Sequence, residues 1–132
     1  MRIALFQGAP NPLDVPGNLQ RLRHQAQRAA ERGAQLLVCP EMFLSGYNIG
    51  LEQVERLAEA EDGPSAMDVV EIAQAHRIAI VYGYPERADD GAIYNSVQLI
   101  DATAAACATT ARRTCSASWT ARCSAPAPII SR

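Results

Sequence analysis

Short apolar runs alternate with longer stretches of helical periodicity over residues 1–100. Each run is too short for a helix of ordinary length, so the runs predict four strands. They lie at 3–6, 34–38, 78–82 and 93–100. The second and third runs are almost uninterrupted, which is typical of strands covered on both faces. We expect the last two strands to pair across a polar turn at 88–91.

The stretch 16–32 has the pattern of an amphipathic helix. Arg and Gln fill its polar side, and Gly33 is placed to close it. The apolar positions, which recur at helical spacing, are Leu19, Leu22, Ala26, Ala29 and Ala30.

Two further helices are predicted before the third strand. The first is short and acidic, and Leu51 and Val54 begin its apolar side. The second runs from Pro64 to His76, because proline is tolerated in the first turn of a helix. The order of strand, helix, strand, two helices and two strands predicts an α/β fold with helices packed on a sheet.

The start of that last helix carries a candidate cap. Ser65 and Asp68 resemble a capping box, with Asp in place of the preferred Glu. Met67, Val70, Ala73 and Gln74 are expected to carry this helix on to His76.

One carboxylate stands out at the end of the second strand. Pro40 cannot continue a central strand, so Glu41 begins a turn at the strand's carboxyl end. Open α/β sheets build their sites at that end. The plainer alternative is a solvent-exposed loop acid after a buried strand.

Composition narrows the function classes. A chain of 132 residues suits one domain, and a net charge of −2 gives no reason to expect a nucleic acid or an anionic membrane as partner. No apolar run approaches a membrane span, and residues 1–7 are too short and too soon polar for a secretory signal. The expected location is the cytoplasm, and no cofactor is implied.

The four cysteines form no CxxC pair, so they indicate neither a metal site nor a disulfide framework. Cys39 lies in the second strand and is expected to be a buried packing thiol. The others are Cys107, Cys115 and Cys123.

The charge balance and the apolar pattern of the chain change near Asp101. Up to Ile100 there are 8 Arg and 13 acidic residues, and from Asp101 onward there are 4 Arg and 1 acidic residue. Apolar periodicity also ends there. We therefore divide the chain into a folded part, 1–102, and a tail, 103–132, that we expect to be disordered.

Several segments, in this order and spacing, resemble the amino-terminal part of the nitrilase, or carbon–nitrogen hydrolase, superfamily. The resemblance covers about residues 1–100, and it rests on the stretches 2–7, 18–19, 33–43, 45–47, 81–86 and 94–96. It implies a partial αββα sandwich of the nitrilase type, truncated here, with helices packed on a mixed sheet. It also implies cleavage of an amide, carbamoyl or nitrile carbon–nitrogen bond in a small substrate, and a homo-oligomer for the intact family.

The resemblance further implies a Glu-Lys-Cys site, in which Glu41 matches the general base. A thiol needs a nearby base to attack, and the developing oxyanion needs a fixed positive donor. The chain contains no Lys, and Cys39 is not at the nucleophile position. Arg112 and Arg113 do not replace the lysine, because a planar guanidinium differs from a compact ammonium.

Other polar residues allow two readings. Tyr47 either lines the substrate pocket or packs beside its turn. Asn95 is expected to hydrogen-bond loop backbone rather than substrate. His24 and His76 are expected to be solvated, and neither is assigned to catalysis.

The tail is interpreted as a frameshifted translation. When residues 108–119 are back-translated and read from the third letter, they give Asn-Tyr-Arg-Lys-Thr-His-Leu-Phe-Gly-Glu-Leu, which is the family's lysine segment in its expected place. A single base lost near Thr103 explains the charge change, the cysteine cluster and the missing lysine together.

Two functional hypotheses follow. In the first, the chain is a truncated, inactive part of a thiol-dependent carbon–nitrogen hydrolase. In the second, it is a non-catalytic partner that docks on an intact homologue through its exposed sheet.

Overall fold

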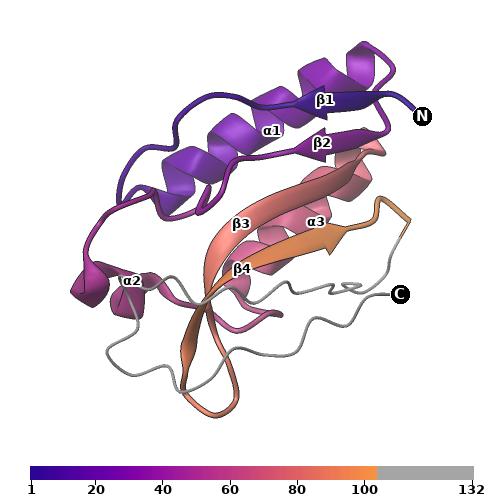
Figure 1. Cartoon of the computed structure of the whole chain (residues 1–132). Helices are drawn as coiled ribbons and strands as arrows, with labels where there is room; N and C mark the ends of the chain where they lie inside the picture. Colours follow the sequence, from indigo (N-terminus) through magenta and orange to yellow (C-terminus); the bar gives the residue numbers. More distant parts are fainter. Residues whose placement is uncertain (104–132) are drawn as a thin grey trace.

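The computed structural model describes residues 1–103, which form one sheet with helices on one side (Figure 1). Four strands and three helices follow one another as expected. In chain order they are β1 (Ile3–Leu5), α1 (Val15–Glu31), β2 (Leu36–Val38), α2 (Leu51–Leu57), α3 (Pro64–His76), β3 (Ala79–Arg87) and β4 (Ile93–Ile100). The predicted tail, 103–132, lies outside the described residues except for Thr103.

The sheet is mixed, with the strand order β1-β2-β3-β4. β1, β2 and β3 are parallel, and β4 returns antiparallel to β3. The hairpin turn closes with a hydrogen bond from the amide of Ala88 to the carbonyl of Ala92, at 2.9 Å. This matches the polar turn predicted at 88–91.

The core lies between the sheet and the two longer helices. Leu22 and Ala26 of α1, Val69 of α3, and Leu37 and Ile80 of the sheet are at most 2% exposed. Burial of such apolar surface is the main stabilising term of the fold. The helical apolar pattern predicted for α1 is therefore confirmed.

The opposite face of the sheet differs from the expectation of strands covered on both faces. Within residues 1–103 the side chains of Leu36, Val38 and Val81 on that face are only partly buried. Ile3 and Leu5 of β1 are 49% and 66% exposed. An uninterrupted apolar run signals that both faces are apolar, and it does not specify what covers each of them.

The capping box predicted for α3 is wrong. Its N-cap is Gly63, and Ser65 does not form a capping box with Asp68. Instead, the Ser65 amide and hydroxyl each donate to the carboxylate of Glu59, at 2.9 Å. Met67 is 62% exposed, because the helix turns Ala66, Val69, Ile72 and Ala73 toward the core.

β3 is longer than the predicted strand 78–82 and runs on through Pro85. The chain segment before α3 lies alongside this extension. The Glu59 amide donates to the Pro85 carbonyl at 3.1 Å, and the Arg87 amide donates to the Glu59 carbonyl at 2.8 Å.

None of the helices in residues 1–103 is long and apolar enough to cross a membrane.

Candidate functional site

Glu41 opens a tight turn that lies against β3. β2 ends at Val38, as the position of Pro40 predicted. The Cys39 amide donates to the Val81 carbonyl at 2.8 Å, and the Leu44 amide donates to the Gly83 carbonyl at 3.2 Å. These two bonds, one on each side of Glu41, fix the turn to the sheet.

Gly83 allows this close approach. A Cβ atom at this position would lie 2.5 Å from the backbone nitrogen of Met42 and 3.0 Å from Cα of Glu41. Real Cβ atoms do not approach backbone so closely, so a side chain at residue 83 would push the turn away. The family resemblance includes this glycine in the stretch 81–86 but gives it no role. A glycine inside an apolar strand is itself a signal of close backbone approach.

The Glu41 carboxylate is held by Asn95 of β4. The side-chain amide of Asn95 donates a hydrogen bond to Oε1 of Glu41. Asn95 is 5% exposed, whereas Glu41 is exposed within the described chain. The expectation for Asn95 was a bond to loop backbone, and this bond to a carboxylate was not expected; the antiparallel return of β4 places Asn95 beside the Glu41 turn.

A second buried amide anchors the far end of the turn. Asn18 is completely buried at the start of α1. Its Nδ2 donates to the Leu44 carbonyl at 2.9 Å and to the Asn11 carbonyl at 2.8 Å, and its Oδ1 accepts from the Asn11 amide at 2.8 Å. The sequence pattern places Asn18 at the helix start and does not predict this anchor. The sequence feature that could have indicated this anchor is an amide side chain beside the apolar face of a helix.

Tyr47 follows the turn but does not pack. Its side chain is 63% exposed, so the reading of a packed aromatic does not hold for the described residues. His24 is exposed, as expected. His76 differs from the expectation, because it is partly buried and its Nε2 has no hydrogen-bond partner among residues 1–103.

Cys39 is a packing residue, as predicted. It is 9% exposed and belongs to the hydrophobic core. Burial raises the pKa of its thiol to about 12. The thiolate is the nucleophilic form, so Cys39 is unreactive at neutral pH.

Polar side chains of β4 meet β3 on the helix-covered face. Ser96 Oγ donates to the buried carboxylate of Glu86 at 2.6 Å, and the Tyr82 hydroxyl donates to Oε1 of Gln98. Gln98 in turn donates to the Glu61 carbonyl at 2.9 Å. The family resemblance includes Glu86 in the stretch 81–86 but gives it no role. These bonds satisfy buried polar groups, which gives the hairpin a fixed register.

Comparison with known proteins identifies the class of protein to which this fold belongs. The family model for carbon–nitrogen hydrolases matches residues 2–115. The chain belongs to the carbon–nitrogen hydrolase family. The match extends past residues 1–100, on which the sequence resemblance rested.

Among curated proteins, the chain is 67% identical over 102 residues to a hydrolase in the pqqF 5' region of Pseudomonas protegens, covering 77% of this chain and 35% of that protein. It is 34% identical over 113 residues to the bromoxynil-specific nitrilase of Klebsiella pneumoniae subsp. ozaenae, covering 76% of this chain and 32% of that protein. The chain thus spans about a third of the length of these relatives.

Among solved structures, the fold matches that of an amidase from Nesterenkonia sp. with a TM-score of 0.61 and 33% identity. The match covers 77% of this chain and 38% of the amidase. The α/β architecture expected from the resemblance, with helices on a mixed sheet, is confirmed for the described residues.

Proposed function

We propose that this chain carries the general-base part of a thiol-dependent hydrolase that cleaves a non-peptide carbon–nitrogen bond. The substrate class is a small amide, carbamoyl or nitrile compound, and Glu41 is the base. The observation that supports this role most directly is the hydrogen bond from Asn95 to Glu41. A buried amide that binds one oxygen of an exposed carboxylate fixes the orientation of that carboxylate. The carboxylate stays accessible to solvent and to a substrate.

The proposed chemistry on an amide runs in two stages. Glu41 takes the proton of a cysteine thiol as the sulfur attacks the amide carbon, and it passes that proton to the departing ammonia. Water then cleaves the thioester with Glu41 again accepting a proton, which releases the carboxylic acid and restores the thiol. A lysine ammonium stabilises the charge on the tetrahedral intermediates.

Related proteins support this chemistry. In a variant of the Nesterenkonia amidase, the acetamide moiety of fluoroacetamide is added covalently at the active site cysteine. The Klebsiella relative is named for bromoxynil, and it is a nitrilase. We carry over the substrate class and the attack by a thiol to the complete hydrolase of which this chain is a part.

We propose that the chain by itself does not turn over substrate. It contains no Lys, and Cys39 is a buried thiol with a pKa of about 12. Tyr47, exposed next to the Glu41 turn in sequence, is proposed to meet the substrate. A reducing cytoplasm suits the buried free thiol, and we expect the complete hydrolase to be a homo-oligomer.

The tail 103–132 is proposed to be a frameshifted translation, as its back-translation indicates. Nucleotide sequencing from the codon of Ile100 onward tests this directly. The expected result is a G-rich run near the codon of Thr103, in which one added base restores the lysine segment. A tail whose codons give no such segment in any frame would refute the proposal.

Activity is tested with two proteins, the 132-residue chain and a version with the reading frame restored. We expect ammonia release from a panel of small amides, carbamoyl compounds and nitriles with the restored protein alone. In that protein Glu41→Gln should lower the rate by about a hundredfold or more. Glu31→Gln, which changes an exposed acid of α1, is the matched control and should leave the rate unchanged. Turnover by the 132-residue chain would contradict the proposal.

A second candidate is a non-catalytic partner of an intact homologue. The side chains of Ile3 and Leu5 are apolar and exposed, and this favours the role of a binding partner. Covering exposed apolar surface with another protein stabilises the complex. Mixing the chain with the intact Pseudomonas relative and measuring the mass of the complex by light scattering tests this role. Separate peaks at the masses of the two free proteins would exclude it.

A further inference from the structure

The two faces of β4 carry different parts of the polar network. On one face, Asn95 donates its hydrogen bond to Glu41. Paired residues of an antiparallel hairpin share a face of the sheet, and side chains alternate along each strand. Gln98 is paired with the core residue Tyr82, so Gln98 and Ser96 lie on the helix-covered face. Both are completely buried, so the middle of β4 presents polar side chains to the core.

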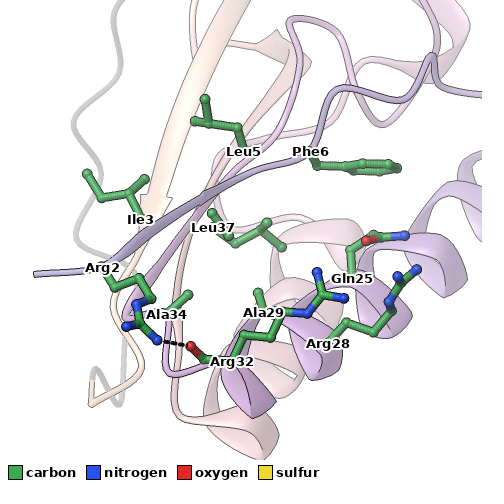
Figure 2. A pocket seen from close by; sticks show the side chains of 11 residues that line it. Arg2, Ile3, Leu5, Phe6, Gln25, Arg28, Ala29, Arg32, Ala34 and Leu37 are labelled. Carbon is green, nitrogen blue, oxygen red and sulfur yellow. Dashed lines mark hydrogen bonds between the residues drawn. The ribbon is translucent and has the colours of Figure 1, made fainter.

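The parallel strand β2 meets the helices differently. Its Leu37 points toward Ala29 of α1, and both residues line the cavity between β1 and α1 (Figure 2). Leu37 is 2% exposed and belongs to the hydrophobic core. Burial of apolar surface stabilises this contact. The middle of β4 needs another source of specificity, because its buried residues are polar.

Apolar burial does not fix the register of β4. A shift of one residue moves every side chain of a strand to the opposite face. Such a shift would bring the apolar side chains of Val97 and Leu99 against the helices, and apolar burial would not oppose it. The same shift would move Asn95 away from the Glu41 turn. Other contacts must therefore hold the strand in its register.

Two buried polar pairs supply these contacts. The Tyr82 hydroxyl donates to Oε1 of Gln98, and Nε2 of Gln98 donates to the Glu61 carbonyl at 2.9 Å. Ser96 Oγ donates to the carboxylate of Glu86 at 2.6 Å, and Glu86 is 2% exposed. A shifted strand would separate these partners inside the core, where polar groups are costly to leave unpaired.

The pair of Gln98 and Tyr82 acts far from the hairpin turn. The turn closes between Ala88 and Ala92, and it limits the register at one end of the hairpin. Gln98 is paired with Tyr82 toward the other end. Asn95 lies between these two points along β4, so its position depends on both.

We propose that Gln98 and Glu86 are positioning residues for Glu41. They fix the register of β4 from the helix-covered face, and they thereby hold Asn95 against the Glu41 carboxylate on the other face. Their effect on the reaction rests on the proposed role of Glu41 as the base, whereas their effect on Asn95 is independent of that role.

The position of Asn95 is tested in the 132-residue chain. Gln98→Leu removes the side-chain hydrogen bonds of Gln98 at nearly the same side-chain size. We expect the side-chain amide signals of Asn95 in NMR spectra to move. The proton contacts between the paired residues Gly83 and Val97, which report the register, should weaken as well.

Glu86 offers a matched pair of variants. Glu86→Gln keeps an oxygen that accepts from Ser96, so the Asn95 signals should stay in place. Glu86→Leu removes the acceptor, and the Asn95 signals should move as they do in Gln98→Leu. Ile72→Val, which removes one methyl group from the core at α3, is the control for a loss of stability alone and should leave the Asn95 signals in place.

The hydrolase with the restored reading frame tests the effect on the reaction. Gln98→Leu and Glu86→Leu should lower kcat about tenfold or more and keep KM within about twofold, because a displaced base slows the chemical step and leaves substrate binding intact. Glu86→Gln and Ile72→Val should keep kcat within about twofold of the unchanged hydrolase.

Asn95 signals that stay in place in both leucine variants would overturn the proposal. An unchanged kcat of these variants, in a hydrolase that Glu41→Gln inactivates, would overturn it as well. Full activity of Glu41→Gln would refute the proposed function instead, and the Asn95 signals would still decide the role of Gln98 and Glu86. Where a leucine variant does not fold, Ser96→Ala, which removes only a donor, takes its place and is judged by the same signals.

Discussion

The side-chain amide of Asn95 donates a hydrogen bond to the Glu41 carboxylate, across a sequence separation of 54 residues. The two residues come from different parts of the chain. Glu41 follows the parallel strand β2, whereas Asn95 lies opposite Pro85 in the antiparallel strand β4. This bond therefore links the Glu41 turn to the β3–β4 hairpin. A substitution in one of them should change the structure or stability of the other.

Asn95→Asp should destabilise the fold by about 2 kcal/mol at neutral pH, because it places two carboxylates where an amide and a carboxylate now bond. Acidic pH should relieve part of this loss, since protonation of one carboxyl restores a donor. Urea unfolding at pH 7 and pH 4.5 measures both effects. Asn95→Leu, which removes the donor without adding charge, is the control and should show little pH dependence of its difference from the unchanged protein. Equal losses for Asn95→Asp at the two pH values would contradict this explanation.

Gly83→Ala should displace the Glu41 turn, because the added methyl would lie 2.5 Å from the Met42 nitrogen. We expect a loss of about 1–3 kcal/mol in the free energy of unfolding, as for other overpacked sites. The side-chain amide signals of Asn95 in NMR spectra should also move, because the bond to Glu41 is strained.

A matched control for Gly83→Ala is Gly91→Ala in the β3–β4 turn. Gly91 has a φ of +80°, and nothing lies within 4 Å of the position that a methyl group would take there. Gly91→Ala should therefore lower the free energy of unfolding by about 1 kcal/mol, through the positive φ alone. The Asn95 side-chain signals should stay in place in this variant. Unchanged Asn95 signals in Gly83→Ala would show that the turn does not depend on the glycine.

Asn18→Ala should lower the free energy of unfolding by about 2–3 kcal/mol, because it removes the side-chain donor of the Leu44 carbonyl and the acceptor of the Asn11 amide. Gln20→Ala, an exposed position on the same helix, should change stability by less than about 0.5 kcal/mol. Denaturant unfolding of the two variants under the same conditions measures the contrast. A similar small effect for both would mean that water replaces the Asn18 contacts.

Cys39 should resist alkylation in the folded chain. Burial raises its thiol pKa from 9.0 to about 12, so at pH 8 its thiolate fraction falls about a thousandfold. Iodoacetamide labelling in a variant with Cys107, Cys115 and Cys123 changed to Ser isolates this thiol. Labelling in urea, where the thiol is exposed, serves as the reference. Folded and unfolded rates within a factor of about ten of each other would contradict the burial.

The same thiol predicts a pH dependence of stability. Because the folded-state pKa is the higher one, the protonated thiol stabilises the fold fully below pH 9, and this contribution is lost as the pH rises from 9.0 toward 12. The stability difference between the unchanged chain and Cys39→Ala should therefore narrow above pH 9. A constant difference between pH 7 and pH 10.5 would argue against the shift.

The sequence by itself determined the element order, the amphipathic side of α1, the end of β2 before Pro40 and the location of Glu41 in a turn. These follow from local rules, because apolar spacing, proline and glycine act on neighbouring residues. Local rules failed where a distant group competes: Ser65 bonds to Glu59 instead of capping α3 with Asp68. Local rules also do not determine what covers each face of the sheet.

Only the tertiary structure decided which polar groups meet across the chain. The bonds from Asn95 to Glu41 and from Asn18 to Leu44 join residues that no spacing rule relates. The approach of Gly83 to Met42 depends on the register of β3 against the turn. A buried polar group takes whichever partner the packed chain brings within reach, and that partner is fixed by the path of the whole chain rather than by its neighbours in sequence.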